Sequence, residues 1–528
     1  MGTFSILKGL QVALINMPIR EGAKPNTPPL GPGLLAAQLR QFGASVSLID
    51  LNVYRLKDKL AERQSLLNGR HLSLEEATGL ISRYFNRDGE PCLIGLSGMI
   101  TTLKWQSQIA SVCRKMVPRA CLVSGGGLAT EMKGVLFNWI PELDAIVLGE
   151  GDKAVIRLAL QVKKGKIKPG ERISLTGTRP DLDALSLPAW DLMEQDVDGC
   201  PILEHYIRTP VWGGSGTQNS SAAPFAMERS LTTVSSRGCP YNCAFCFRGA
   251  QGARNYGQRS ADSLIKEACW LRDRYAIDFL GFNDDNFAVM PDRLNLLATR
   301  FPDEVGLHWG THIRLDMADD RLYTMAKAGC IYAGYGAESA SPRVLTLMNK
   351  GGMMLTQGLV RVNGFLFPRT MVEGVIKTQE AGIHGNCTWI MGYPGEKLDD
   401  LKTSVGFILW QVEKATESLA SGTREYQGAS EAVNQNMFMA TAYPGTAMFR
   451  TKPVRERLSR QFGLKFSAKG RVIADSALRL YVESLGDAAN VISDKNGNPI
   501  NFSDISDDKL LIARSLISQG KIGKILNL

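Results

Sequence analysis

The 528-residue sequence predicts an α/β protein in three parts: an N-terminal doubly wound, Rossmann-like parallel sheet, a partial (β/α)6 barrel of the TIM type, and a helical C-terminal tail. Two observations support this fold class. Short apolar runs alternate with amphipathic segments along most of the chain, which is the pattern of parallel sheets. Glycine and polar residues gather directly after the apolar runs, at the strand ends where such folds bind ligands.

The composition is that of an ordinary globular protein, with 44% hydrophobic and 21% charged residues. No apolar run reaches the about 18 residues that a membrane span needs. The N-terminal stretch MGTFSILKGLQVALINMP is interpreted as a core strand, not a signal peptide. We therefore expect a cytoplasmic protein. The net charge of +9 without a dense Lys/Arg block favours a small anionic substrate over nucleic acid.

The first 160 residues are predicted to form the parallel sheet, with an amphipathic helix at residues 33–41 after the first strand. The five predicted strands are residues 11–17, 46–51, 92–97, 120–124 and 144–148. The last three end in the turns Ser97-Gly98-Met99, Gly125-Gly126-Gly127 and Gly149-Glu150. Such glycines let a large flat ligand approach the backbone closely, although a generic flavodoxin-like domain would carry similar turns.

Residues 161–230 are predicted to be a linker and a loop. Within them, LSLPAWDLM at residues 185–193 is a proline- and tryptophan-containing segment, and GGSGTQNSSAAP at residues 213–224 is rich in Gly and Ser. The second stretch is either a lid over the substrate or an unstructured insertion.

The stretch LTTVSSRGCPYNCAFCFR at residues 231–248 places Cys239, Cys243 and Cys246 in CxxxCxxC spacing after a strand-like run. Thiolate ligands select soft metals, mainly zinc and iron–sulfur clusters. A structural zinc site takes four ligands, usually as two pairs, and no second Cys or His pair lies nearby. A four-iron cluster held by three cysteines keeps one iron open for a small molecule. The spacing favours the cluster, and a structural zinc loop is the alternative.

After the cysteines the strand–helix alternation returns, and with the strand before the cysteines it gives six β/α units. The five later strands are predicted at residues 278–283, 308–313, 330–336, 386–391 and 436–441. Polar or glycine residues follow them, among them Asn283-Asp284-Asp285, Arg314, Glu338-Ser339 and Gly392. Each acidic residue alone is as well explained as a helix N-cap. At successive strand ends, however, they predict a binding site.

The cysteine loop resembles that of the radical S-adenosylmethionine (SAM) enzymes, in which an aromatic residue such as Phe245 precedes the third cysteine. The resemblance covers residues 231–446. It implies a 4Fe-4S cluster that binds SAM and cleaves it to a deoxyadenosyl radical, with an electron from a partner such as flavodoxin or ferredoxin. The chain lacks the GGE tripeptide that the family carries after the second strand. The implied SAM contacts are Asp284, Asp285, Arg314, Glu338, Ser339, Ile390 and Gly392.

The N-terminal segments PPLGPGLLAAQL, SGGG and LGEGD resemble the cobalamin-binding domain that precedes many radical SAM domains. The DxHxxG signature is absent and His71 is the only histidine of this region, so the resemblance implies cobalamin without a protein histidine on cobalt. Residues 99–105 are predicted to be the segment that faces the lower side of cobalt. The implied cobalamin contacts are Ser97, Gly98, Met99, Gly125, Gly126, Gly127, Gly149 and Glu150.

Together the resemblances imply a cobalamin-dependent radical SAM methyltransferase, which moves a methyl group from SAM through methylcobalamin to an unactivated carbon, or a phosphinate phosphorus, of a small biosynthetic substrate. Two alternatives stay open. One is a cyclase or rearrangement enzyme with the same domains, and the other is a cobalamin- or redox-responsive binding module. The expected parts are residues 1–160 for cobalamin, 161–230 as linker and loop, 231–446 for the cluster and SAM, and 447–528 as the helical tail.

Overall fold

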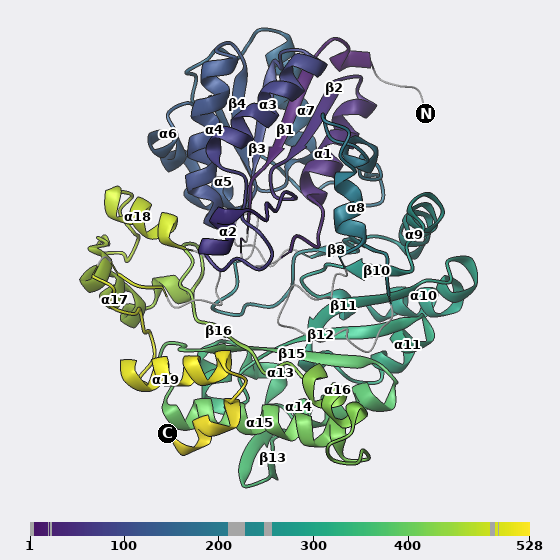
Figure 1. Cartoon of the computed structure of the whole chain (residues 1–528), viewed down its shortest axis with the longest axis vertical. Coiled ribbons are helices and arrows are strands. Elements are labelled where there is room, and N and C mark those ends of the chain that lie inside the picture. Colours follow the sequence, from purple (N-terminus) through teal and green to yellow (C-terminus); the bar gives the residue numbers. More distant parts are fainter. Residues whose placement is uncertain are drawn as a thin grey trace. The chain divides into compact units, whose positions relative to one another are not determined.

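The computed structural model describes residues 5–19, 21, 24–209, 227–247, 256–485, 492–494 and 496–528. Their contacts divide the chain into two compact units (Figure 1). Unit 1 holds the described residues up to 209 together with residues 474–485, and unit 2 holds residues 227–247, 256–473 and those from 492 onward. Within the described residues, no helix is both long enough and apolar enough to cross a bilayer.

Unit 1 is built on a six-stranded parallel sheet in the order β2-β1-β3-β4-β5-β6. The order reverses between β1 and β3, which is the kind of switch point where open α/β sheets bind ligands. Helix α1 packs beside α7, and α3 packs beside α4. The strands are β1 (Gln11–Asn16), β2 (Ser45–Asp50), β3 (Leu93–Ser97), β4 (Cys121–Gly125), β5 (Ala145–Leu148) and β6 (Ile173–Thr176). The helices are α1 (Leu30–Gln41), α2 (Lys59–Arg63), α3 (Leu74–Asp88), α4 (Leu103–Met116), α5 (Gly127–Met132), α6 (Leu136–Trp139), α7 (Gly151–Lys163), α8 (Ile202–Ile207) and α18 (Ser476–Ser484).

The prediction that residues 144–148 form the last strand of this sheet is wrong, because β6 adds a sixth strand beside β5. Strands such as β1 are buried on both faces, so they show as continuous apolar runs. The residues of β6 alternate between half-buried and exposed, as expected of a strand at the edge of a sheet. Edge exposure removes the apolar run by which the other five strands are recognised.

The predicted linker segment at residues 185–193 packs against α1 inside unit 1. Trp190 is fully buried, and a Cβ atom on Gly33 would lie 2.8 Å from its ring. The backbone N–H of Ala189 donates to the carbonyl of Gly33 at 3.1 Å. Gly33 therefore makes room for the tryptophan. The Gly/Ser-rich stretch at residues 213–224 lies outside the described residues.

Unit 2 contains a second six-stranded parallel sheet, in the order β16-β15-β12-β11-β10-β7, which confirms the six β/α units. Neighbouring strands follow one another along the chain, as in one half of a (β/α) barrel. The strands are β7 (Ser230–Thr233), β10 (Phe279–Phe282), β11 (His308–Arg314), β12 (Cys330–Glu338), β15 (His384–Met391) and β16 (Met437–Met439), and a two-stranded ribbon joins β8 (Ser236–Arg237) to β9 (Gly257–Gln258). The helices are α9 (Ala261–Tyr275), α10 (Pro291–Glu304), α11 (Arg321–Lys327), α12 (Pro342–Leu347), α13 (Gly351–Met354), α14 (Arg369–Glu380), α15 (Leu398–Thr416), α16 (Arg424–Ala432), α17 (Lys452–Phe462) and α19 (Asp507–Ser518).

Residues 342–368, for which the sequence analysis makes no prediction, form α12, α13 and an antiparallel hairpin of β13 (Leu359–Val362) and β14 (Phe365–Pro368). The hairpin carries the label β13 at the lower edge of Figure 1. Asn363 and Gly364 join its strands with positive φ angles of 47° and 85°. Asn-Gly is the dipeptide that tight hairpin turns prefer, so this element was readable from the sequence.

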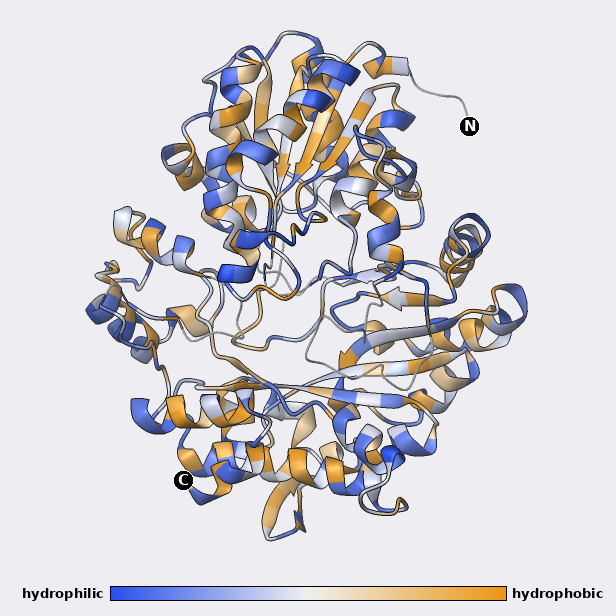
Figure 2. Ribbon diagram, viewed as in Figure 1, coloured by the Kyte–Doolittle hydropathy of each residue, from blue (hydrophilic) through white to orange (hydrophobic). Residues whose placement is uncertain are grey.

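The outer face of the half-barrel packs on helices. The Thr233 hydroxyl donates to Glu267 of α9 at 3.0 Å, and the Tyr335 hydroxyl lies 2.7 Å from that of Thr378 on α14. Side chains alternate along a strand, so Thr232, Gly334 and Asn386 belong to the inner face. Several strands of unit 2 are paler in Figure 2 than the orange strands of unit 1, which fits an inner face of small and polar residues.

Candidate cofactor sites

The three motif cysteines lie on the loop that follows β7 and β8 in unit 2. Cys239 and Cys243 are half-buried, and Cys246 is more exposed. Desolvation raises the pKa of Cys239, and the neighbouring Cys243 adds to the rise. Desolvation, followed by the charges of Asp285, Cys243 and Cys239, likewise raises the pKa of Cys246. Cys239 and Cys243 therefore lie close enough to Cys246 to raise its pKa, and so do Asp285 and Glu338. The role of the three thiols as cluster ligands stays a prediction.

Backbone hydrogen bonds fix this cysteine loop from two directions. The Ala244 N–H donates to the carbonyl of Met348 at 2.8 Å, and the Ala244 carbonyl accepts from the Met448 N–H at 2.7 Å. The Asn349 side chain donates to the carbonyl of Asn242 at 2.7 Å. The loop is thus held by the segment between α12 and α13 on one side and by the turn after β16 on the other.

Arg314, the last residue of β11, joins the cysteine loop to the half-barrel. Its Nη1 donates to Cys243 Sγ at 3.3 Å, and its guanidinium lies 4.1 Å from the centre of the Tyr241 ring. The other side of the guanidinium binds both carboxylate oxygens of Asp316, at 2.9 and 2.5 Å. Because the Asp316 side chain is fully buried, this ion pair fixes the direction in which Arg314 points. Arg314 therefore contacts a thiol, and the SAM contact implied for it stays a prediction.

Asp284 ties the end of β10 to the chain segment that leads into the cysteines. Its Oδ1 accepts from the Ser235 N–H at 2.6 Å, and its Oδ2 accepts from the hydroxyls of Ser235 and Ser236. Burial raises the pKa of this carboxyl, while the serine hydroxyls act in the opposite direction. Both oxygens are engaged inside the protein, whereas the neighbouring Asp285 is exposed. Asp285 is thus the more exposed of the two predicted SAM contacts here.

Glu338 is paired with a lysine that the sequence analysis does not identify. It is the last residue of β12, not a residue after it, and it has a φ of 66°. Its Oε1 accepts from the buried Lys350 Nζ at 3.0 Å, and a Cβ atom on Gly336 would come within 2.6 Å of that oxygen. Lys350 Nζ also lies 5.9 Å from the ring centre of Phe245. The pair therefore lies beside the cysteine loop.

The remaining predicted SAM contacts differ in their exposure. Ser339 is fully buried, and its hydroxyl is bound to that of Ser404 and to the Ser341 N–H, both at 3.1 Å. Ile390 is half-buried on β15, and Gly392 starts the next turn with a φ of 77°. Ile390 and Gly392 lie at the end of β15, where a flat ligand could pack against them. Ser339 instead uses its hydroxyl for hydrogen bonds within the protein.

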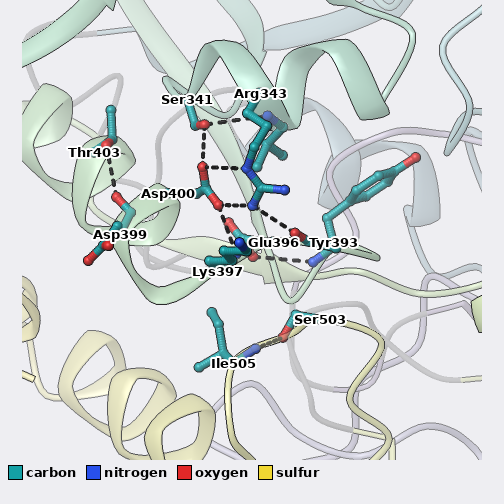
Figure 3. A network of polar contacts seen from close by, with 12 residues as sticks. Ser341, Arg343, Tyr393, Glu396, Lys397, Asp399, Asp400, Thr403, Ser503 and Ile505 are labelled. Carbon is teal, nitrogen blue, oxygen red and sulfur yellow. Dashed lines mark hydrogen bonds and ion pairs between the residues drawn. The ribbon is translucent and has the colours of Figure 1, made fainter.

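The turn after β15 is held by the carboxylate of Glu396 (Figure 3). Its Oε2 accepts from the N–H groups of Gly392 and Tyr393, at 2.5 and 3.2 Å. Its Oε1 is buried without a hydrogen-bond partner among the described residues. Burial raises the pKa of Glu396 to about 8. Nearby, Arg343 forms an ion pair with Asp400 and donates to the carbonyl of Gly395 at 2.7 Å.

Glu396→Gln is expected to flatten the pH dependence of stability. A carboxyl whose pKa is higher in the folded state than in the unfolded chain binds its proton more tightly when folded, so the free energy of unfolding falls as pH rises from about 4.5 to about 8. Each unit by which the folded-state pKa exceeds the unfolded-state pKa corresponds to about 1.4 kcal/mol in the free energy of unfolding. Denaturant unfolding at several pH values should show this slope in the wild type and a shallower slope in the variant. An equal slope in both proteins would contradict the assignment.

In unit 1 the predicted cobalamin contacts lie at the carboxyl ends of β3, β4 and β5. A Cβ atom on Gly126, where φ is 85°, would lie 2.7 Å from the Gly98 carbonyl oxygen, so these two turns touch through their backbones. Gly125 and Gly127 flank this contact, and a Cβ atom on Gly125 would meet nothing within 4 Å. Met99 is exposed at the same strand ends, and the contact of these residues with cobalamin stays a prediction.

Gly126→Ala is expected to destabilise unit 1 by about 1–3 kcal/mol, because the new methyl group meets a backbone atom at a positive φ. It should also reduce cobalamin retention after gel filtration, read from the visible absorbance of the protein peak. Gly134→Ala is the matched control, since a Cβ atom there would meet nothing within 4 Å. Equal cobalamin retention by Gly126→Ala and wild type would show that this turn does not belong to the cobalamin site.

Two further features of unit 1 concern the same strand ends. Glu150 forms an ion pair with Arg179 at 2.8 Å, and Gly177 passes so close that a Cβ atom on it would overlap the Glu150 carbonyl. His71 is buried, and its Nδ1 lies 2.9 Å from Arg55 Nη1. Burial, and then the charge of Arg55, lowers the pKa of His71 to about 3. His71 is therefore a neutral side chain engaged with a neighbour.

No three His, Cys, Asp or Glu side chains of the described residues are arranged as the ligands of a single metal ion. The ligands of a four-iron cluster bind different irons and so lie further apart than those of one ion. The donor set of three thiols on one loop with aromatic neighbours fits a cluster with one open iron.

Comparison with known proteins gives matches over both units. Residues 233–408 match the family model of the radical SAM superfamily. The uncharacterized methyltransferase PH0819 of Pyrococcus horikoshii is 22% identical over 84% of this chain and 83% of its own length. The cytidylyl-2-hydroxyethylphosphonate methyltransferase of Streptomyces wedmorensis is 24% identical over 72% of this chain and 73% of its own.

Solved structures share the fold. The cobalamin-dependent SAM radical enzyme OxsB, with aqua-cobalamin and SAM bound, superposes with a TM-score of 0.62 at 17% identity, over 89% of this chain and 64% of that one. This chain thus spans less than two thirds of the length of OxsB. The radical SAM methyltransferase TsrM from Kitasatospora setae superposes with a TM-score of 0.59 at 16% identity, over 98% of this chain and 88% of that one.

Proposed function

We propose that this chain, whose residues 233–408 belong to the radical SAM superfamily, is a cobalamin-dependent radical SAM methyltransferase that acts on an unactivated carbon, or a phosphinate phosphorus, of a small substrate. The observation that carries the proposal is the cysteine loop. Its three thiols lie together at the carboxyl ends of a six-stranded half-barrel, and Arg314 and the Glu338–Lys350 pair adjoin them.

Unit 1 supports the cobalamin part of the proposal. Its sheet carries glycine turns at three adjacent strand ends, where Gly98 and Gly126 meet through their backbones and a Cβ atom on Gly125 would meet nothing within 4 Å. Two relatives whose similarity extends over most of the chain are named methyltransferases. Of the solved structures with this fold, OxsB was determined with aqua-cobalamin bound.

Bound together, SAM, a reduced cluster and cobalamin supply radical generation and methyl transfer, and the protein's part is to hold and orient them. Cys239, Cys243 and Cys246 would hold the cluster. Asp285 and Glu338 lie close enough to Cys246 to raise its pKa, and either carboxylate suits an amino or hydroxyl group of SAM. Ser97 to Met99, Gly125 to Gly127 and Gly149 would contact cobalamin through their backbones.

The inner face of the half-barrel supports a polar substrate. Thr232 Oγ1 and both amide atoms of Asn386 are buried without a hydrogen-bond partner among the described residues, although such groups are usually satisfied. The net charge of +9 favours an anionic group on the substrate. Reduction of the cluster requires an external electron, for which we propose flavodoxin or ferredoxin as the source.

A cyclase is the second candidate, because the anaerobic magnesium-protoporphyrin IX monomethyl ester cyclase of Cereibacter sphaeroides is 24% identical over 63% of this chain and 52% of its own length. Both candidates use the same cysteine loop and differ in the fate of the SAM methyl group. A cyclase leaves that group on SAM-derived methionine, whereas a methyltransferase also forms S-adenosylhomocysteine.

The test uses the full chain, reconstituted anaerobically with iron, sulfide and cobalamin, and SAM labelled with deuterium in the methyl group. After reduction with titanium(III) citrate, a methyltransferase should release S-adenosylhomocysteine and place the label on protein-bound cobalamin, which mass spectrometry detects without knowledge of the substrate. Deoxyadenosine without S-adenosylhomocysteine or labelled cobalamin would favour the cyclase and contradict the methyltransferase.

A further inference from the structure

A shallow groove on the surface of unit 2 lies between the β13–β14 hairpin and the helices α12 and α15. It encloses about 530 Å³ and is open to solvent along its length. The groove takes one wall from the hairpin and the other from the start of each helix. Its lining includes Arg343, Leu359, Arg361, Leu366, Asp399 and Lys402.

The charges of the groove are mainly positive. Three basic side chains, Arg343, Arg361 and Lys402, line it against one acidic side chain, Asp399. Arg343 is paired with Asp400, and Arg361 extends along the hairpin to the Gly364 carbonyl at 3.1 Å. With Asp400 included, the groove carries three basic and two acidic side chains, a net charge of +1, in a chain whose own net charge is +9.

Large apolar side chains are exposed in the groove. Leu359 and Leu366 of the hairpin are 42% and 44% exposed, and both line it. Exposed Leu side chains within a basic rim are typical of protein interaction surfaces.

Helix α12, which forms part of the groove wall, leads directly to residues that hold the cysteine loop in place. Arg343 is the second residue of α12, which ends at Leu347. The next residue is Met348, whose carbonyl accepts from the Ala244 N–H at 2.8 Å. In α13, Met353 Sδ lies 3.5 Å from the Tyr241 hydroxyl of the same loop. The groove and the cysteine loop thus contact opposite ends of α12, with Arg343 at its start and Met348 directly after its end.

We propose that this groove is the docking surface for a small acidic electron-carrier protein of the flavodoxin or ferredoxin class. This inference rests on the proposed function, because it assumes a cluster on the cysteine loop. The reduced carrier loses one electron, the oxidised cluster gains it, and no bond or proton changes place. A basic groove with apolar contacts complements an acidic carrier, and docking there brings the carrier to the helical segment that holds the cysteines.

The test compares the full-length wild type with Arg361→Glu/Lys402→Glu and with Leu366→Ser, all exposed or half-exposed positions outside the proposed cofactor sites. Lys266→Glu/Lys327→Glu makes the same change of charge on α9 and α11 and is the matched control. Binding of a purified flavodoxin is measured by surface plasmon resonance at low and moderate salt. Deoxyadenosine formation is measured with flavodoxin and its reductase, and separately with titanium(III) citrate.

We expect the groove charge variant to bind flavodoxin about tenfold more weakly at low salt and to lose flavodoxin-supported turnover in proportion, with titanium-supported turnover and the control unchanged. Leu366→Ser should weaken binding with little change in its salt dependence. Wild-type binding by both groove variants, or equal losses in the control, would overturn the proposal. Analytical sedimentation gives a further check. If the wild type is a dimer and the groove variants are monomers, the groove binds a second copy of the chain, and the proposal is also overturned.

Failure of the proposed function would look different. If the wild type forms no deoxyadenosine with titanium(III) citrate, the cluster chemistry is wrong. The binding measurement still decides the docking surface in that case, because it needs no turnover.

Discussion

Replacement of Cys239, Cys243 and Cys246 together by alanine is expected to reduce the iron content after anaerobic reconstitution from about four per chain to near zero. The three thiols are the donors that the cysteine loop offers, and backbone bonds from Met348 and Met448 fix it. The absorbance and the electron paramagnetic resonance signal of the cluster should be lost, and deoxyadenosine formation should fall to background. Thermal unfolding should change little, because the cysteine side chains are only partly buried.

Cys269→Ala is the control for this experiment. Cys269 lies on α9 and is also half-buried, so its removal tests the loss of a thiol away from the loop. It should keep wild-type iron content and deoxyadenosine formation. A triple variant that retains about four irons would show that the cluster is bound elsewhere and would refute the site.

Arg314→Met is expected to have the second largest effect. It leaves the fully buried Asp316 carboxylate without its partner, and breaking a buried ion pair in this way costs about 3–5 kcal/mol of stability. It also removes the hydrogen bond to Cys243 Sγ, and loss of a hydrogen bond to a ligating sulfur should lower the reduction potential of the cluster. Denaturant unfolding measures the first effect and a spectroscopic redox titration the second.

The double variant Arg314→Met/Asp316→Asn separates the two effects. It removes the unpaired charge, so stability should recover in part while the lowered potential remains. Arg321→Met breaks a more exposed pair with Asp319 and should cost about 1 kcal/mol or less. A wild-type potential in both Arg314 variants would show that Arg314 contributes only to stability.

The strands and the cysteine loop could be predicted because their signals are local. Buried parallel strands read as short apolar runs, and a CxxxCxxC spacing is recognised without knowledge of the fold. The glycine turns after β3 to β5 were found in the same way, and the structure adds the reason for two of them, since Gly98 and Gly126 meet through their backbones.

The partners of the site residues could not be predicted, because they depend on long-range contacts. Lys350 lies in a turn between two short helices, and only the fold brings it to Glu338. Asp284 precedes a helix as an ordinary N-cap would, yet its carboxylate binds Ser235 and Ser236 on another strand. Glu396 follows a turn glycine, and its burial depends on packing that no local pattern reveals.

The central claim is that one chain holds a four-iron cluster in unit 2 and cobalamin in unit 1. Anaerobic reconstitution with iron, sulfide and cobalamin, followed by gel filtration and measurement of iron and cobalt in the protein peak, tests it most directly. We predict about four irons and about one cobalt per chain. Four irons without cobalt would contradict the account of unit 1, and cobalt without iron would contradict the account of the cysteine loop.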